Sequence, residues 1–253
     1  MTQRRMSELV GKLFPASFVG SYPRPSWYEY NLGGRDLLEA FMDEDFAQAY
    51  CDGIRVIIGD QEDVGLDVLS DGHLWYDKHQ GFISSFLLYN LERLDGIEIR
   101  PRLSENAVFA RTSGMDTGVT DQLENTGMSE VFETFLTAEH AVVDKIGRGR
   151  LRHALQWRLA QRCTTTPVKA FFAMGPIELS TMLVDEHYRD RKAMLRDLAE
   201  VYRAEMLEAV AAGARIVELD DLIYTAPPEE WEFAVEILNR VFEGVDAYKI
   251  WHC

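Results

Sequence analysis

The chain has 253 residues, 47% of them hydrophobic, and a formal net charge of −16 at pH 7. The length suits one large domain, and the negative charge argues against nucleic acid and anionic membranes as partners, because both reward clustered Lys and Arg. The chain's three scattered cysteines predict a reducing, cytoplasmic setting, and no apolar run approaches the roughly 20 residues of a membrane-spanning helix.

Strand patterns alternate with helix patterns along most of the chain. Short apolar segments predict strands at 14–20, 66–69, 168–173, 215–219 and 247–251, and amphipathic patterns predict helices at 43–63, 129–146, 151–163, 191–212 and 228–242. This alternation is typical of a parallel sheet with helical crossovers, and we predict an α/β fold of the TIM (β/α)8-barrel type. Because a barrel needs eight strands, we expect it to lack its last two strand-helix units in this chain.

One segment departs from this alternation. Residues 87–126 have irregular periodicity, several glycines and β-type segments at 97–99 and 107–110. We interpret them as an excursion of strands and loop from a single, partial barrel domain that covers residues 1–253.

Polar residues follow each predicted strand. Gly20 and Ser21 come at the end of the first, and such a turn frees backbone N–H groups for an anion, although an ordinary Pro-rich loop is an alternative. Asp71, Gly72 and His73 follow the second strand, where His73 could be a ligand, a base or a buried structural histidine. Met174 and Gly175 form the turn after the strand at 168–173.

The helix at 191–212 ends at Gly213, and the next strand leads into Asp220 and Asp221. These two acids could bind a substrate amine, orient a metal ligand or cap the next helix. The last strand runs into His252 and Cys253, whose imidazole and thiolate are preferred zinc donors. Adjacent side chains point to opposite faces of a strand, so both can bind one ion only if the strand has ended.

Taken together, these segments resemble a known family. The motifs at 20–25, 65–72, 174–176 and 211–221 and the strand before His252 occur in the same order as in the catalytic barrel of cobalamin-independent methionine synthase and its relatives, which include the epoxyalkane:coenzyme M transferases. The resemblance spans Ser17 to Cys253. It implies a zinc ion that binds a thiol substrate, with Ser21 at the substrate carboxylate, Asp220 near its amino group and the His252 region at zinc.

Three positions depart from the family. His73 stands where the family has a Glu that contacts the homocysteine amine, and His252-Cys253 replaces the family's His-x-Cys motif, for which we prefer His252 as the ligand. The remaining zinc ligands would fall after residue 253, so we expect a C-terminal segment or a second chain to supply them and to complete the barrel.

The resulting prediction is a zinc-dependent transferase that moves a methyl or other alkyl group to a thiol. Asp220 and His73 are its candidate catalytic residues, and the candidate substrate-binding residues are Gly20, Ser21, Asp71, Asp221, Met174 and Gly175. The alternatives are coenzyme M alkylation by an epoxide or another electrophile, a non-catalytic subunit that completes a second chain, and a metal-dependent lyase or hydrolase.

Overall fold

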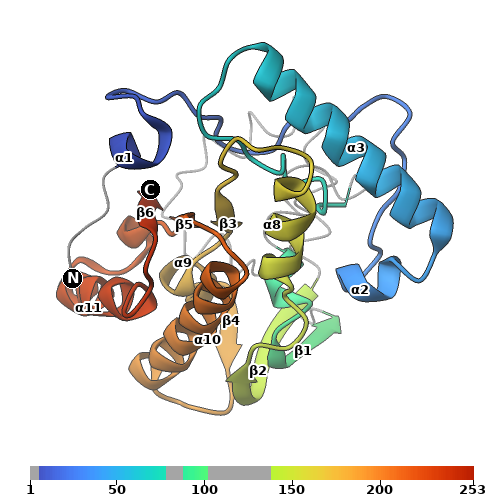
Figure 1. The fold of residues 1–253 in the computed structure, drawn as a ribbon. Coiled ribbons are helices and arrows are strands. Elements are labelled where there is room, and N and C mark those ends of the chain that lie inside the picture. Colours follow the sequence, from blue (N-terminus) through green and yellow to red (C-terminus); the bar gives the residue numbers. More distant parts are fainter. Residues whose placement is uncertain (1–5, 78–87, 102–137) are drawn as a thin grey trace, which may run out of the picture.

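A computed structural model describes residues 6–77, 88–101 and 138–253. Helices and strands alternate in it to give a mixed α/β fold (Figure 1). The helices are α1 (Met6–Val10), α2 (Leu37–Ala40), α3 (Glu44–Asp63), α8 (His153–Gln161), α9 (Pro176–Ser180), α10 (Arg191–Ala211) and α11 (Trp231–Val241). The strands are β1 (Asp95–Pro101), β2 (Ala138–Gly147), β3 (Ala170–Phe172), β4 (Leu183–Asp185), β5 (Ile216–Asp220) and β6 (Tyr248–His252).

Parallel partners lie side by side in the order in which they occur along the chain. Single bridges join Ser17 to Val68 and Leu69 to Val168. Next, β3 pairs with β5 and β5 pairs with β6, all in parallel (Figure 1). The strands predicted at 168–173, 215–219 and 247–251 are therefore confirmed, whereas those at 14–20 and 66–69 form bridges alone. The named strands make two open three-stranded sheets, so a barrel is not shown by the described residues.

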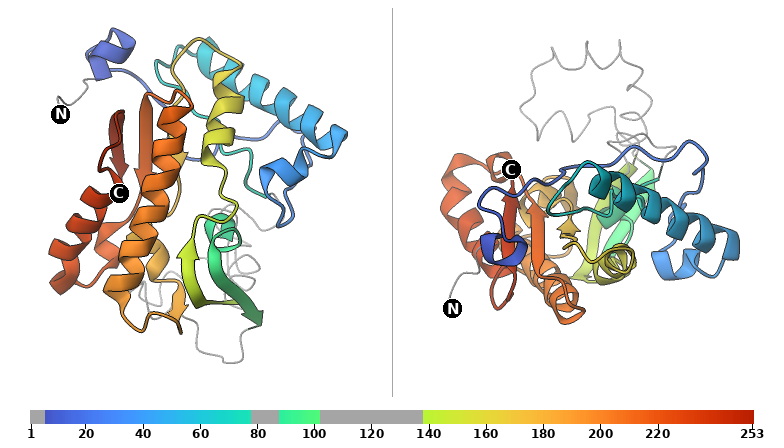
Figure 2. Two further views of the ribbon diagram at one scale, coloured as in Figure 1. Left: turned by 60° about the horizontal axis from the view of Figure 1, so that its bottom comes forward. Right: turned by 45° about the horizontal axis from the view of Figure 1, so that its top comes forward.

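The long helix α10 packs against strands of both sheets. The Asp190 side chain caps its first turn by accepting hydrogen bonds from the backbone N–H groups of Lys192 and Ala193. After the helix ends, Gly213 takes a φ of +118°, which a residue with a side chain rarely adopts. The buried face of α10 packs on α8, α9, α11, β2 and β3, and Figure 2 shows the helix running alongside β5. Each large apolar side chain buried there stabilises the fold by about 1.5–3 kcal/mol.

The prediction of a helix at 129–146 is wrong where it can be checked. Residues Ala138–Gly147 form β2, which pairs antiparallel with β1 and parallel with β4. The adjacent β-branched residues Val142 and Val143 favour a strand, and pairing on both edges overrides the helical pattern. Of the two β-type segments expected in the 87–126 excursion, 97–99 lies in β1 and is confirmed, whereas 107–110 lies outside the described residues.

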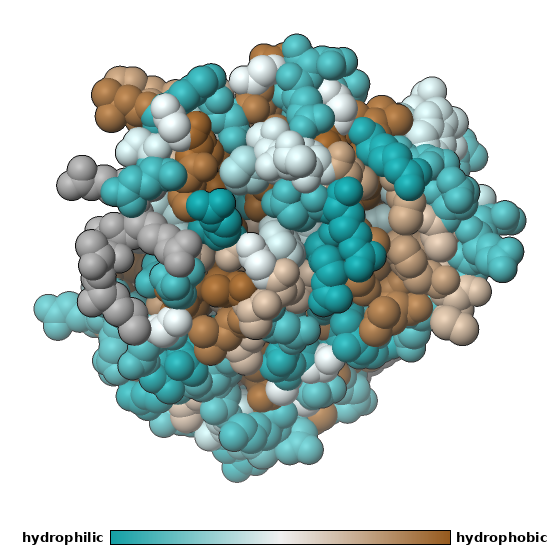
Figure 3. All heavy atoms as spheres, viewed as in Figure 1, coloured by the Kyte–Doolittle hydropathy of each residue, from teal (hydrophilic) through white to brown (hydrophobic). Residues whose placement is uncertain are grey.

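The surface carries residues of both hydrophilic and hydrophobic character. Hydrophilic and hydrophobic residues intermingle over the face seen in Figure 3. Among the described residues, no helix combines the length and the apolar character that crossing a bilayer requires.

Candidate functional site

The carboxyl end of β5 presents two acids on one side of the sheet. Glu218 and Asp220 are two residues apart in a strand, so their side chains point the same way. β6 places His252 opposite Asp220, with His252 Nδ1 3.7 Å from Glu218 Oε1 and 3.8 Å from Asp220 Oδ1. The structure thus brings together two residues singled out from the sequence, Asp220 and His252.

A buried lysine, missed in the sequence, completes this side of the sheet. Lys169, next to β3, places its Nζ 2.6 Å from Glu218 Oε2 and donates a hydrogen bond of 2.5 Å to the carbonyl of Phe18. Both charged side chains are buried. Each is a charged residue flanked on both sides by apolar strand residues, and this was the signal that could have identified them.

The first two strand ends meet through their backbones. The N–H of Tyr22 donates to the carbonyl of Gly72, so the Gly20-Ser21 turn lies beside the turn at 71–73. Gly72 has a φ of +69°, and a Cβ there would lie 2.7 Å from Ile57 and 2.9 Å from Tyr22. Only glycine fits this close contact.

Asp71 organises the second turn. One of its carboxylate oxygens accepts from the N–H of His73 at 2.9 Å and the other from Trp75 Nε1 at 2.9 Å. His73 follows with a φ of +54°, a left-handed conformation that is uncommon outside glycine and costs free energy. Asp71, expected to bind substrate, is therefore engaged in holding His73 in position.

His73 is buried against an aromatic ring. Its imidazole stacks on Phe171, with ring centroids 4.0 Å apart. Burial, together with the positive charges of Lys169 and His252, lowers the pKa of His73 to about 4, against the opposing effect of Asp71. His73 is consequently neutral at physiological pH.

The turn after β3 is tied to the end of β5. The N–H of Gly175 donates to the carbonyl of Asp220 at 2.7 Å, and the backbone of Met174 is also left-handed, with a φ of +46°. The Asp221 carboxylate accepts from the N–H groups of Ile177 and Glu178 at the start of α9. A Cβ on Gly175 would lie 2.4 Å from Asp221, which explains the glycine. Asp221, predicted to contact substrate or cap the following helix, is fully buried and caps the preceding one.

Three carboxyl groups crowd this strand end. Burial, followed by the charges of Asp220 and Asp221, raises the pKa of Glu178 to about 8. Burial raises the pKa of Asp221 to about 7, against the backbone hydrogen bonds that it accepts. The pKa of Asp220 is also raised, mainly by burial, although the nearby His252 opposes the shift. These acids share one poorly hydrated region.

Several of the buried polar atoms without a hydrogen-bond partner lie at the strand ends, and others, such as Tyr50 Oη and His153 Nε2, lie elsewhere in the core of the described structure. Among the described residues, each of the following buried atoms lacks a hydrogen-bond partner: Ser21 Oγ, His73 Nε2, Glu178 Oε2, Glu218 Oε1 and His252 Nδ1. Four of them belong to residues of parallel strands or of the turns that follow them, and Glu178 lies on the short helix α9 after β3. Buried polar groups are normally paired, so this concentration marks the place where a ligand would be bound.

The predicted zinc ligands are present but do not make a complete centre. Over the described parts of the chain, no three His, Cys, Asp or Glu side chains are placed to hold a metal ion together. His252 fits the role of a ligand, because its Nδ1 is unbonded beside two carboxylates. Cys253 is exposed and free, as expected for a thiol that is available to bind.

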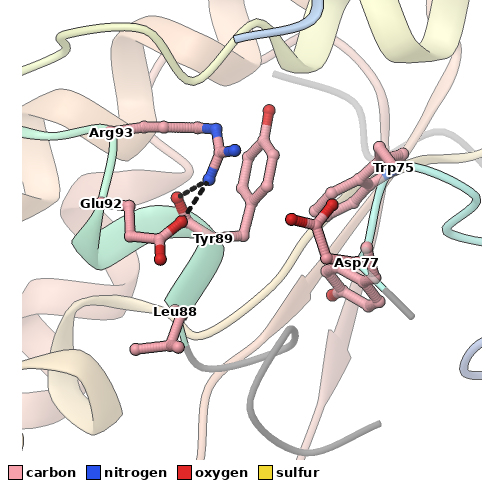
Figure 4. Close-up of a pocket in the computed structure, with 7 residues that line it drawn as sticks. Trp75, Asp77, Leu88, Tyr89, Glu92 and Arg93 are labelled. Atoms are coloured by element: carbon pink, nitrogen blue, oxygen red, sulfur yellow. Dashed lines mark hydrogen bonds and ion pairs between the residues drawn. The ribbon is translucent and has the colours of Figure 1, made fainter. Parts of the chain in front are cut away.

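A small cavity lies behind the second strand end. Its volume of about 10 Å³ is room for a single water molecule. Figure 4 shows Arg93, which donates to the Tyr89 carbonyl and pairs with Glu92, and Asp77 on the opposite side of the Tyr89 ring. Asp77 also accepts hydrogen bonds from the backbone N–H groups of Leu32 and Gly33, so its carboxylate is engaged in the fold. The cavity itself is too small for a substrate.

Comparison with known proteins bears on all of these residues. No family model matches the chain. It is 24% identical over 240 residues to the methionine synthases of Saccharolobus islandicus and Sulfurisphaera tokodaii, which covers 95% of this chain and 62% and 61% of those proteins. The chain therefore spans about three fifths of the length of these relatives.

Solved structures give the same result for the fold. A B12-independent methionine synthase from Shewanella sp. W3-18-1, solved in complex with selenomethionine, matches 95% of this chain with a TM-score of 0.66 and 20% identity, and 61% of that chain is covered. A putative vitamin-B12 independent methionine synthase from Listeria monocytogenes matches 94% with a TM-score of 0.57 and 18% identity, with 64% of it covered. The resemblance predicted from the sequence motifs is confirmed.

Proposed function

We propose that this chain is the catalytic part of an enzyme that transfers a methyl group, or another alkyl group, to a thiol in the manner of a methionine synthase. The single observation that carries the proposal is the meeting of the strand ends around unpaired buried polar atoms, in a chain that is similar to methionine synthases over 95% of its length. The proposal includes the barrel fold, with the parallel partners from Ser17 to β6 as one arc of it.

The chain's own residues have separate tasks in this proposal. Asp220 orients the acceptor from the end of β5, Ser21 binds its carboxylate, and Met174-Gly175 lies on the donor side. Asp71 and Asp221 serve indirectly, since their oxygens are occupied by His73 and by α9. Holding the reacting atoms in line in this way lowers the barrier by positioning.

Zinc is part of the same proposal. His252 would hold the ion, with Cys253 as the second candidate, and ligands from outside the described residues or from a second chain would complete the site. Bound there, zinc would lower the pKa of the acceptor thiol, so that the nucleophilic thiolate is present at neutral pH.

The decisive test is a methyl-transfer assay on the full-length protein together with metal analysis. We expect methylation of homocysteine from a reduced methylfolate, zinc bound at one ion per chain, and loss of activity on chelation that zinc restores. A metal-free protein with full activity would overturn the zinc assignment, and a zinc-containing protein that methylates no thiol would overturn the transferase. Sedimentation of the same sample shows whether a second chain is needed.

One observation favours a second candidate, alkylation of coenzyme M or a similar thiol. His73 is neutral where the family has a Glu that contacts the amine, so that position offers an amino group no negative charge. Presenting both acceptors in one assay distinguishes the candidates, and His73→Glu should gain homocysteine activity if this position decides between them.

A further inference from the structure

A buried ion pair lies next to His252. Lys169 Nζ is 2.6 Å from Glu218 Oε2, and the two side chains are 2% and 1% exposed. Lys169 also donates a hydrogen bond to the carbonyl of Phe18, so the pair joins the first strand segment to β5. Two charges taken out of water lose hydration that apolar side chains of similar volume do not need, so such a pair is weak evidence for stability. Its place beside a candidate metal ligand indicates a second role.

The pair leaves one carboxylate oxygen of Glu218 unused. Oε2 faces Lys169, whereas Oε1 is buried and has no hydrogen-bond partner in the part of the chain that the structure describes. This oxygen lies 3.7 Å from Nδ1 of His252, and Asp220 Oδ1 lies 3.8 Å from the same nitrogen. Within the described ranges these three side chains are not placed to hold a metal ion together. The unused oxygen of Glu218 is therefore better suited to bind the imidazole than to bind an ion beside it.

The two carboxylates decide which nitrogen of His252 carries the proton. A ring nitrogen that faces carboxylate oxygens is favoured as an N–H donor, because a lone pair there would face negative charge. Nε2, at the far edge of the ring, then keeps its lone pair, and a metal ion binds only a nitrogen that has one. The side chain of His252 is 38% exposed, and its exposed part does not include Nδ1. The accessible edge of the ring is thus the edge that can bind a metal ion.

We propose that Glu218, held in place by Lys169, is a positioning residue for His252. It accepts a hydrogen bond from Nδ1–H when the site is occupied, which closes the present separation of 3.7 Å and directs Nε2 toward the ion. Carboxylates that accept from the second ring nitrogen fix the orientation of metal-binding histidines and make them better ligands. The inference rests on the proposed function, in which His252 binds zinc, and adds two residues that contact neither the ion nor the substrate.

Glu218→Gln should reverse the preference of the imidazole. The ammonium group of Lys169 pairs with the amide oxygen, so the amide NH2 group faces Nδ1 and favours a proton on Nε2 instead. The measurement is the nitrogen NMR spectrum of the metal-free, full-length protein labelled with 15N-histidine, with His252 assigned by its loss in His252→Gln. We expect a proton on Nδ1 in the wild type and on Nε2 in Glu218→Gln.

Zinc affinity of the same proteins, measured by competition with a chelator, is the second readout. We expect Glu218→Gln to bind zinc about 10–100-fold more weakly than the wild type. Adding Lys169→Met frees the amide to turn its oxygen toward Nδ1, and the double variant should recover part of this loss. Glu205→Gln is the matched control, because Glu205 is also buried and ion-paired but lies on α10, and its zinc affinity should stay within about twofold of the wild type.

Two results would overturn the positioning role. One is an unchanged proton position together with unchanged zinc affinity in Glu218→Gln. The other is a double variant that loses as much zinc affinity as His252→Gln, which would make Glu218 a ligand itself. If Glu218→Gln does not fold, Glu218→Asp keeps the charge, withdraws the oxygen from His252 and should lower zinc affinity to a similar extent. A wild-type protein that binds no zinc disproves the zinc part of the proposed function, whereas the proton position in the metal-free protein still tests Glu218.

Discussion

Two buried glutamates, Glu205 and Glu178, have opposite electrostatic environments. Glu205, on α10, accepts from Arg148 Nε at 2.7 Å and lies 3.0 Å from His153 Nδ1. Burial alone would raise its pKa, but His153 and Arg148 lower it to about 2. Glu178 is buried to a similar degree without a cation, and its pKa rises to about 8.

The two environments distinguish an acid that stabilises the fold from an acid that lies at the candidate site. At Glu205, burial is offset by Arg148, which directly follows β2, and by His153 on α8. At Glu178 the chain supplies a backbone N–H group and no opposite charge. Burial by itself therefore does not identify a functional acid, whereas burial without a partner beside other unpaired groups does.

The largest effect on stability is expected at Glu205, which is paired with Arg148 and His153. Glu205→Ala removes the acceptor of Arg148, whose side chain is 42% exposed, and of the buried His153, and losing hydrogen bonds to a charged group costs about 1.5–3 kcal/mol. Urea unfolding should show this loss in the free energy of unfolding. A loss below about 1 kcal/mol would mean that the pairing contributes little to stability.

The next largest effect is expected at Asp220, which lies in the candidate site. Asp220→Asn removes the charge that orients the acceptor, and we expect kcat/KM to fall about 100-fold, in the range found when one charged contact to a substrate is lost. The melting temperature should stay the same or rise. Unchanged kinetics in a folded variant would reduce Asp220 to a residue that shapes the strand end.

The pH dependence of stability should also distinguish the two regions. Because the pKa values of Glu178 and Asp221 are raised to about 8 and 7, the folded protein holds protons that the unfolded chain releases, and stability falls as pH rises. Below pH 6.5 the lowered pKa of His73 works in the opposite direction. The net loss should therefore appear between pH 6.5 and 8, at about 1–2 kcal/mol in the ligand-free protein.

The pKa shift of Glu205 makes stability depend on pH in the opposite direction. Its lowered pKa contributes stability that is present above about pH 4.5 and is lost as pH falls toward 2. Melting temperatures measured from pH 2 to 9 test both the loss of stability at low pH and the loss between pH 6.5 and 8. A flat curve between pH 6.5 and 8 in the wild type would show that Glu178 and Asp221 are not held protonated by the fold.

The smallest effect is expected for Glu178→Gln in the absence of substrate. Because its pKa of about 8 keeps Glu178 largely protonated at neutral pH, Glu178→Gln replaces one neutral side chain with another. The free energy of unfolding should stay within about 1 kcal/mol of the wild type, and the fall between pH 6.5 and 8 should flatten. A loss of several kcal/mol would place Glu178 in the same class as Glu205.

The local patterns predicted much of the fold, because α3, α10 and the strands at β3, β5 and β6 have strong periodicity and clear ends. The helix predicted at 129–146 is a strand from residue 138 on, because the segment itself does not reveal the two neighbouring strands that pair with it. Asp220 and His252 were identified because they follow strands directly. Glu178 was missed because it lies within a short helix, and its meaning depends on Leu222, Asp220 and Asp221, which lie more than 40 residues further along the chain.

The order of the parallel partners has a consequence for how the protein is made. Each segment pairs with one that precedes it in the chain, from Ser17 with Val68 to β5 with β6. A newly added strand therefore finds its neighbour already synthesised, and the sheet can grow in one direction as the chain leaves the ribosome. On that route the acids of β5 are in place before His252 is added, so the site's charged residues assemble last around a scaffold that is already packed.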